Sequence, residues 1–172
     1  MQKKDIAKRI AMYGVFGALA IIMAYLERLF PPPIPIPFVK LGLANIVVVM
    51  ALYAFGVRAA FAIAVLRIGV IALLFGNPFS FAYSLAGGLV SFAVMVGVKH
   101  LNIFGVVGVS VFGGVFHNVA QIAIGAVLVQ NAGLFYYAPV MIIAGVVTGM
   151  LIGYAGGFAL RNIKIIQRVG GV

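Results

Sequence analysis

The sequence predicts an all-α integral membrane protein, a bundle of six transmembrane helices with both termini in the cytoplasm. Of its 172 residues, 65% are apolar and only 8% are charged, whereas about a quarter of the residues in soluble domains are charged. The apolar residues form six runs of ~17–25 residues, long enough to cross the ~30 Å hydrocarbon core of a bilayer. Lys and Arg stand at the ends of these runs, where membrane proteins place them.

The elements follow from the order of apolar runs and breakers. A basic head precedes the first run, and the segment Pro31–Pro37 cannot be helical because each proline fixes φ and disfavours helix in the residue before it. Turns are predicted at Gly56–Arg58, Gly76–Phe79 and Gln130–Gly133, with a short connection after Lys99. Within a bilayer the runs are expected to be helical, because backbone groups must be satisfied inside their own segment. Residues 1–172 are expected to form one membrane domain with helices at about 10–30, 39–55, 58–75, 80–98, 104–129 and 137–160 and a proline-rich outer loop at 31–37.

The positions of Lys and Arg predict the orientation. With the N-terminus inside, nine basic residues lie at inner helix ends, only Arg28 and Lys40 lie at outer ends, and Arg67 is left within a helix. Cytoplasmic ends are the ones enriched in Lys and Arg, so both termini are expected in the cytoplasm. The net charge of +10 follows from this placement and does not indicate nucleic-acid binding. The first run lacks a clear small-residue cleavage site, so it is expected to be a retained helix.

Polar residues within the apolar runs indicate a site in the outer half of the bundle. His117 and Gln121 are four residues apart on one helix face, with Asn118 beside them. Such side chains at membrane depth either form a functional site or join helices by hydrogen bonds. We favour a ligand site, because other polar residues fall at the same depth. The substrate-binding residues expected beneath the proline loop are Glu27, Lys40, Asn45, Arg67, Asn77, Tyr83, His117, Asn118, Gln121 and Tyr136; for Lys40 and Tyr136 an interface-anchoring role is an equal alternative.

Arg67 is the most informative single residue. It lies ~13 Å above the inner end of its helix, at ~1.5 Å per residue, too deep to reach water easily. Three partners remain open for its guanidinium: Glu27, the anionic group of a ligand, or backbone carbonyls. A lone histidine such as His117 does not indicate metal binding, so neither a metal nor a cofactor is expected.

Small residues four apart form the second pattern. On the first helix Gly14 and Ala18 make one such pair, and Ala20 and Ala24 make another. Faces of this kind let helices approach closely, either within the bundle or against a partner membrane protein. Gly145, Gly149 and Gly153 in the last helix repeat the GxxxG spacing and are interpreted as internal packing.

These features resemble a known type of transporter subunit. The chain is similar to the substrate-binding (S) component of an energy-coupling factor (ECF) transporter in its six short helices, its cytoplasmic termini and its outer substrate region. The segment Ala20–Ala24 also resembles the docking motif AxxxA of such components. Further segments spread over about residues 10 to 160 resemble the family called Gx transporters, also labelled heptaprenyl diphosphate synthase component I. They are Gly42–Val47, Leu66–Arg67, Leu74–Asn77, Tyr83–Gly88 and His117–Gln121.

The resemblance implies a substrate-binding membrane component of an ECF-type ABC uptake transporter for a small vitamin-like or anionic organic molecule. Its partners would be that molecule, membrane lipids, a coupling membrane protein docked at Gly14, Ala18, Ala20 and Ala24, and two ABC ATPases, in a prokaryotic cytoplasmic membrane. The alternative is a membrane accessory subunit of isoprenoid or quinone (prenyl diphosphate) synthesis that binds a lipid-like intermediate. A stand-alone channel or carrier is a weaker third possibility, since no inverted repeat is visible.

The residue types argue against an enzyme. Prenyl transfer needs clustered aspartates that hold magnesium and diphosphate, whereas this chain has only Asp5 and Glu27 as acids. There is no GxxxxGK[ST] phosphate loop, no cysteine, and no partner residue that would complete a catalytic set with His117. The chain is therefore expected to bind rather than to catalyse.

Overall fold

The computed structural model describes residues 3–29, 42–76 and 78–169, with side chains for residues 7–29, 42–76 and 78–162. The described residues form helices and turns and contain no strand, which confirms the all-α class. The elements are α1 (Lys3–Leu29), α2 (Leu43–Ala54), α3 (Val57–Phe75), α4 (Pro78–His100), α5 (Val106–Val129), a 3-10 helix η1 (Ala132–Tyr137), and α6 (Ala138–Val169).

Five of the described helical segments are long and apolar enough to cross a bilayer: Ala7–Leu29, Val57–Phe75, Pro78–His100, Val106–Val129 and Ala132–Asn162. Their outward faces carry large apolar side chains, such as that of Leu73, which is 88% exposed. Exposed apolar surface on this scale is normal where lipid covers it. The chain is therefore a multi-pass membrane protein.

Helix α2 is shorter than the sequence predicts. It begins at Leu43 rather than Val39, because Gly42 has a φ of +73° that a right-handed helix does not accommodate. Its 12 residues rise only ~18 Å at ~1.5 Å per residue. Nearly all of its middle turns are buried, so α2 is the central helix of the bundle and ends below the level that its neighbours reach.

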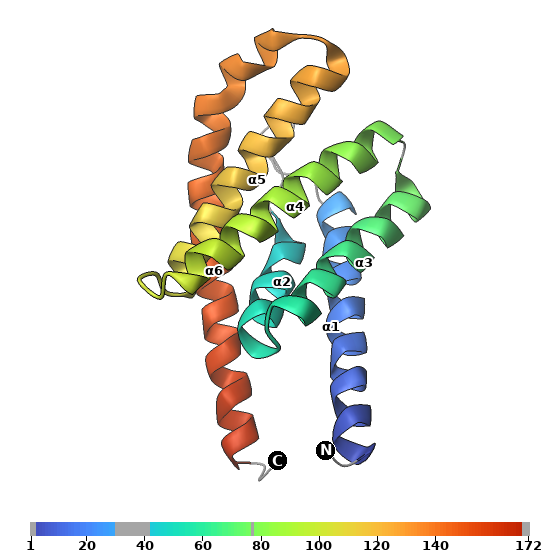
Figure 1. Cartoon of the computed structure of the whole chain (residues 1–172), viewed down its shortest axis with the longest axis vertical. Coiled ribbons are helices and arrows are strands. Elements are labelled where there is room, and N and C mark those ends of the chain that lie inside the picture. The colour runs from blue at the N-terminus through green and yellow to red at the C-terminus, as the bar shows by residue number, and fades with distance from the viewer. Residues whose placement is uncertain (1–2, 30–41, 77, 170–172) are drawn as a thin grey trace.

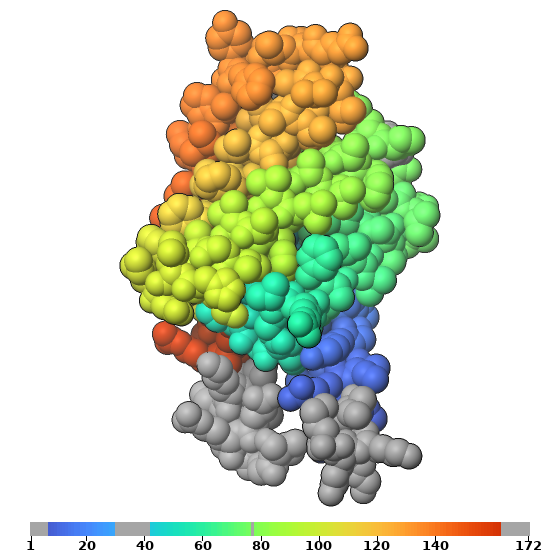
Figure 2. Space-filling model, viewed as in Figure 1, coloured from blue at the N-terminus to red at the C-terminus, as the bar shows by residue number. Residues whose placement is uncertain are grey.

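The helices form two groups that meet along their length. α1, α2 and α3 contact one another, and α5 packs on both α4 and α6, while α2–α6 and α3–α4 contacts join the groups. Figure 1 shows the first turns of α1 and the last turns of α6 at the same end, with η1 at the opposite end. Figure 2 shows the side chains of α4 packed obliquely between those of α5 and α3. This arrangement agrees with the predicted alternation of inner and outer turns.

Glycines bring α5 and α6 into backbone contact. A Cβ added at Gly145 would lie 2.8 Å from the Gly114 carbonyl oxygen, and one added at Gly149 would lie 2.6 Å from Val111 Cα. At Gly153 it would lie 2.6 Å from Val107 Cα. No real Cβ fits at such distances, so this stripe exists because glycine alone lets the two helices approach. The interpretation of the three α6 glycines as internal packing is confirmed.

A second set of glycines brings α4 and α5 close together. A Cβ added at Gly113 would meet Met95 and Ser91, and one added at Gly125 would lie 3.5 Å from the ring of Tyr83. Between them, Gly87 of α4 lies against the side chains of His117 and Gln121, which are one helical turn apart on α5. The small residues therefore alternate between the two helices, and they set how closely the polar face of α5 lies against α4.

The two small-residue pairs of α1 have different environments. Gly14 and Ala18 are exposed, and a Cβ added at Gly14 meets nothing within 4 Å. Ala20 is 0% exposed in the core, and Ala24 lines a cavity. Of the four residues predicted to form the docking face, Gly14 and Ala18 therefore lie on the surface of the bundle, whereas Ala20 packs inside it.

Replacing Gly149 with alanine is expected to destabilise the bundle by about 1–3 kcal/mol, because the new Cβ meets backbone atoms of α5 and forces the helices apart. The matched control is Gly157→Ala in the same helix, where the added Cβ meets only Val106 Cβ, at 4.0 Å. Both changes bring the same gain in helix propensity. Thermal unfolding in detergent should show a lower midpoint for Gly149→Ala alone; equal midpoints would contradict the packing argument.

Candidate functional site

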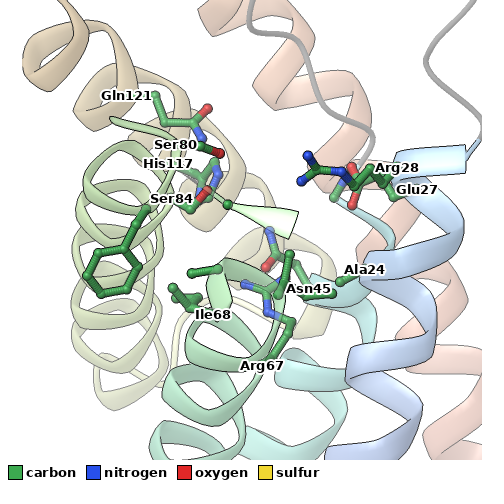
Figure 3. Close-up of a pocket in the computed structure, with 15 residues that line it drawn as sticks. Ala24, Glu27, Arg28, Asn45, Arg67, Ile68, Ser80, Ser84, His117 and Gln121 are labelled. Atoms are coloured by element: carbon green, nitrogen blue, oxygen red, sulfur yellow. The ribbon is translucent and has the colours of Figure 1, made fainter. Parts of the chain in front are cut away.

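A cavity of about 400 Å³ lies among α1, α2, α3, α4 and α5. Its volume falls within the range of ~300–1,000 Å³ that is usual for small-molecule sites. Every helix contributes the half nearer its outer end. Figure 3 shows the polar side chains around it. The lining residues are Ala24, Glu27, Arg28, Gly42, Asn45, Arg67, Ile68, Ile71, Ala72, Gly76, Ser80, Phe81, Ser84, His117 and Gln121.

The cavity brings together half of the predicted binding residues. Glu27, Asn45, Arg67, His117 and Gln121, which come from four different helices, all line it. Helical spacing and depth account for this convergence, because each of these residues lies within about three turns of the outer end of its helix.

Three other predicted residues lie elsewhere. Asn118 is buried against α6, and Tyr83 lines a separate cavity of about 10 Å³. Tyr136 is 89% exposed in η1, so the structure does not place it at the main cavity. Lys40 and Asn77, with the proline loop at 31–37, lie outside the described residues.

One wall of the cavity carries charge. Glu27 lies at the end of α1, where its carboxylate accepts a hydrogen bond from the backbone N–H of Gly42. Next to it, Arg28 Nη2 donates to the carbonyl oxygen of Phe75 at 2.8 Å and lies over the Phe75 ring. Arg28 therefore closes the C-terminal end of α3 with a cation, which a helix C-terminus favours.

Arg67 forms the floor of the cavity, below Glu27 and Arg28 in Figure 3. It is partly exposed to the cavity, and its Nε atom has no hydrogen-bond partner within the part of the chain that the structure describes. Glu27 is near enough to attract it electrostatically, and Figure 3 shows the two side chains apart, on different sides of the space. Arg67 therefore brings a guanidinium to the cavity lining with at least one donor, Nε, that has no partner among the described residues.

The opposite wall is polar without formal charge. Ser80 and Ser84 are one turn apart on α4, and His117 and Gln121 are one turn apart on α5. Figure 3 groups these four side chains on one side of the cavity, across from Arg28 and Glu27. Both amide atoms of Gln121 are buried and have no hydrogen-bond partner among the described residues. On this wall, the amide of Gln121 is therefore available to a group from outside the bundle.

Asn118 has a structural role instead. Its Nδ2 donates to the carbonyl oxygen of Met141 in the first turn of α6, at 2.7 Å. Both residues are buried, so the bond replaces the water that neither group can reach. Of the two roles that the sequence leaves open, Asn118 has that of a link between helices.

Five polar or turn residues of the cavity are absent from the predicted binding residues: Arg28, Gly42, Gly76, Ser80 and Ser84. The four-residue spacing of Ser80 and Ser84 at the start of a helix was a usable signal, since it places both hydroxyls on one face. No group of three or more His, Asp or Glu side chains able to hold a metal ion occurs in the described residues.

Comparison with known proteins identifies one family. A family model described as heptaprenyl diphosphate synthase component I matches residues 16–159, which include all the described cavity residues. No curated protein and no solved structure matches the chain. The match confirms the resemblance to this family that the sequence motifs indicate.

The structural role of Asn118 is testable. Asn118→Leu is expected to lower the free energy of unfolding by about 1–3 kcal/mol, because the Met141 carbonyl loses a buried donor. The thermal midpoint in detergent measures this loss. Retention of cavity binding by the folded fraction would separate Asn118 from the binding residues, whereas an unchanged midpoint would show that the link contributes nothing.

Proposed function

We propose that this chain, which belongs to the heptaprenyl diphosphate synthase component I family, is the substrate-binding membrane component of an uptake transporter for a small organic anion. The observation that carries the proposal is a 400 Å³ cavity in the outer half of a membrane bundle with Arg67 as its floor. An ionisable side chain at membrane depth marks a functional site by default. Its charge needs an anion or water, and the cavity has room for either.

The chemistry of the lining supports an anionic ligand with a neutral polar part. Arg67 and Arg28 outnumber Glu27 as charged groups, and a guanidinium matches a carboxylate with two parallel hydrogen bonds. Ile68, Ile71 and Phe81 add apolar surface. A vitamin-like organic acid combines these properties, whereas an inorganic ion would leave the apolar walls without a partner.

Binding followed by transport fits the chain better than catalysis. Glu27 is the only acidic side chain at the cavity, so no pair of carboxylates is present there to hold magnesium and diphosphate. The sequence also lacks a phosphate-binding loop, so energy for uptake would come from separate ATPases. These would act through a coupling membrane protein, in the manner of ECF transporters, and the cavity would face the outside while both termini face the cytoplasm.

The exposed small-residue pair on α1 is the surface we assign to that coupling protein. Gly14 and Ala18 are exposed one turn apart on a helix that lies at the side of the bundle. A partner helix approaches closely where side chains are small. Docking there leaves the cavity free, because Glu27 and Arg28 lie more than two turns further along α1.

A second candidate function rests on the description of the family. As an accessory component of prenyl diphosphate synthesis, the chain would hold a lipid-like diphosphate in the cavity and bind a soluble synthase at its inner end. The two arginines of the cavity suit a diphosphate as well as a carboxylate. The partner that accompanies the protein distinguishes the two functions.

Arg67→Gln is expected to weaken binding of small carboxylic acids at least about tenfold, because hydrogen bonds to a charged group contribute about 1.5–3 kcal/mol. Binding is measured by equilibrium dialysis of the purified protein against a defined library of such acids, with mass spectrometry of the bound fraction. Arg58→Gln, in the same helix but exposed at its inner end, is the control and should retain full affinity. Equal affinities in both variants and the wild type would remove Arg67 from the site.

Purification from native membranes is expected to bring two ABC-type ATPases and a coupling membrane protein with the chain. Gly14→Leu with Ala18→Leu should reduce their recovery several-fold, since leucine side chains hold a partner helix away. Gly97→Leu on α4, which is also exposed with nothing within 4 Å of its added Cβ, is the matched control. Recovery of a prenyl synthase subunit instead would support the second candidate and contradict the first.

A further inference from the structure

We infer that the uncharged wall of the cavity recognises an amide edge, so that the ligand is an organic acid whose other end carries an N–H donor beside a carbonyl oxygen. The inference rests on the proposed binding function and specifies the class of substrate. It assigns the acid to Arg67 and the amide to Gln121.

Gln121 is the residue that carries this inference. It is 0% exposed, it lines the cavity, and neither its Oε1 nor its Nε2 has a hydrogen-bond partner among the described residues. A side-chain amide offers a planar donor and acceptor side by side. Buried polar atoms are nearly always paired, so a buried amide with both polar atoms unpaired beside a cavity indicates a partner that supplies one acceptor and one donor together.

The surroundings of Gln121 direct it to the main cavity. On its other side lies the small cavity of about 10 Å³, lined by Tyr83, Ile122 and Met141 among others. That volume is at the lower limit for a single water molecule and excludes an organic group. Of the two cavities that Gln121 lines among the described residues, the one with space for an organic ligand is the 400 Å³ cavity, which Arg67 also lines.

Gly87 fixes the position of this wall. A Cβ added there would lie 2.8 Å from Gln121 Cγ and 3.0 Å from His117 Cε1. The α5 side chains therefore lie directly against the α4 backbone, which limits the rotamers open to both. A wall held in this way is organised before the ligand arrives, and preorganised groups bind with less loss of conformational entropy.

The two walls together give the ligand a direction. Figure 3 shows Gln121, His117 and Ser80 on one side and Arg67 with Asn45 on the other. A site that hydrogen-bonds a polar group rejects an analogue that lacks it, because its own buried atoms are then left unpaired. Acids without an amide edge would leave Gln121 unpaired, and amides without an acid would leave Arg67 unpaired.

The test uses six probes in two matched sets. Orotate and pyroglutamate are cyclic amides that carry a carboxylate; benzoate and cyclopentanecarboxylate keep the acid and lack the amide; uracil and 2-pyrrolidinone keep the amide and lack the acid. Affinities are measured for the purified full-length protein by ligand-observed NMR. The amide acids are expected to bind at least about tenfold more tightly than either analogue, since each hydrogen bond to a charged or buried group contributes close to a factor of ten.

Variants separate the two ends of the site. Gln121→Met keeps the length of the side chain and removes its polar atoms, so it should reduce the affinity of the amide acids to that of the simple acids. Gly87→Ala should act in the same direction by displacing Gln121, whereas Gly97→Ala, which meets nothing within 4 Å in the same helix, should not. Each variant is first shown to retain the thermal midpoint of a folded protein.

The outcomes distinguish the amide assignment from the proposed anion-binding function. If simple acids and amide acids bind equally, with a loss in Arg67→Gln and none in Gln121→Met, the amide assignment is wrong and the anion-binding function stands. If no acid of this set or of the wider library binds, the proposed function fails, and the inference fails with it. Preference for the amide acids that disappears in Gln121→Met and persists in Gly97→Ala supports the assignment.

Discussion

The close contact between α5 and α6 at Gly114 and Gly145 governs the arrangement of the site. With α6 held against one face of α5, the adjacent face, which runs from Gly113 to Gly125, is left for α4. That second face carries His117 and Gln121. Because the first contact is between backbones and has no freedom to slide, the orientation of α5 is fixed, and with it the direction in which its polar side chains point.

Two polar residues of α5 illustrate how a neighbour decides the role of a side chain. Asn118 and Gln121 are three positions apart in one helix, and both are almost fully buried. Asn118 meets the carbonyl of Met141 and becomes part of the framework. Gln121 meets the α4 backbone at Gly87, a residue without a side chain, and its amide has no hydrogen-bond partner among the described residues.

Much of the fold and about half of the site follow from the sequence, and the differences have physical causes. Apolar runs and breakers predicted the helices, but α1 begins earlier, at Lys3, and α6 continues further, to Val169. Helix α2 starts later because Gly42 adopts a left-handed φ. Depth and helical spacing predicted the convergence of Arg67 and His117. They do not reveal which way a helix face turns: the spacing of Ala20 and Ala24 is that of a docking motif, and only the packing of α1 on α2 and α3 shows that this face is internal.

The cavity lies on the seam between the two groups of helices. Arg67 belongs to the α1–α2–α3 group, and Gln121 belongs to the α4–α5–α6 group. A molecule that touches both residues would therefore link helices of the two groups. Its arrival would stiffen the bundle as a whole, and amide hydrogens far from the cavity would exchange more slowly in the loaded protein. The same molecule would leave most readily when the two groups shear apart, without any helix unfolding.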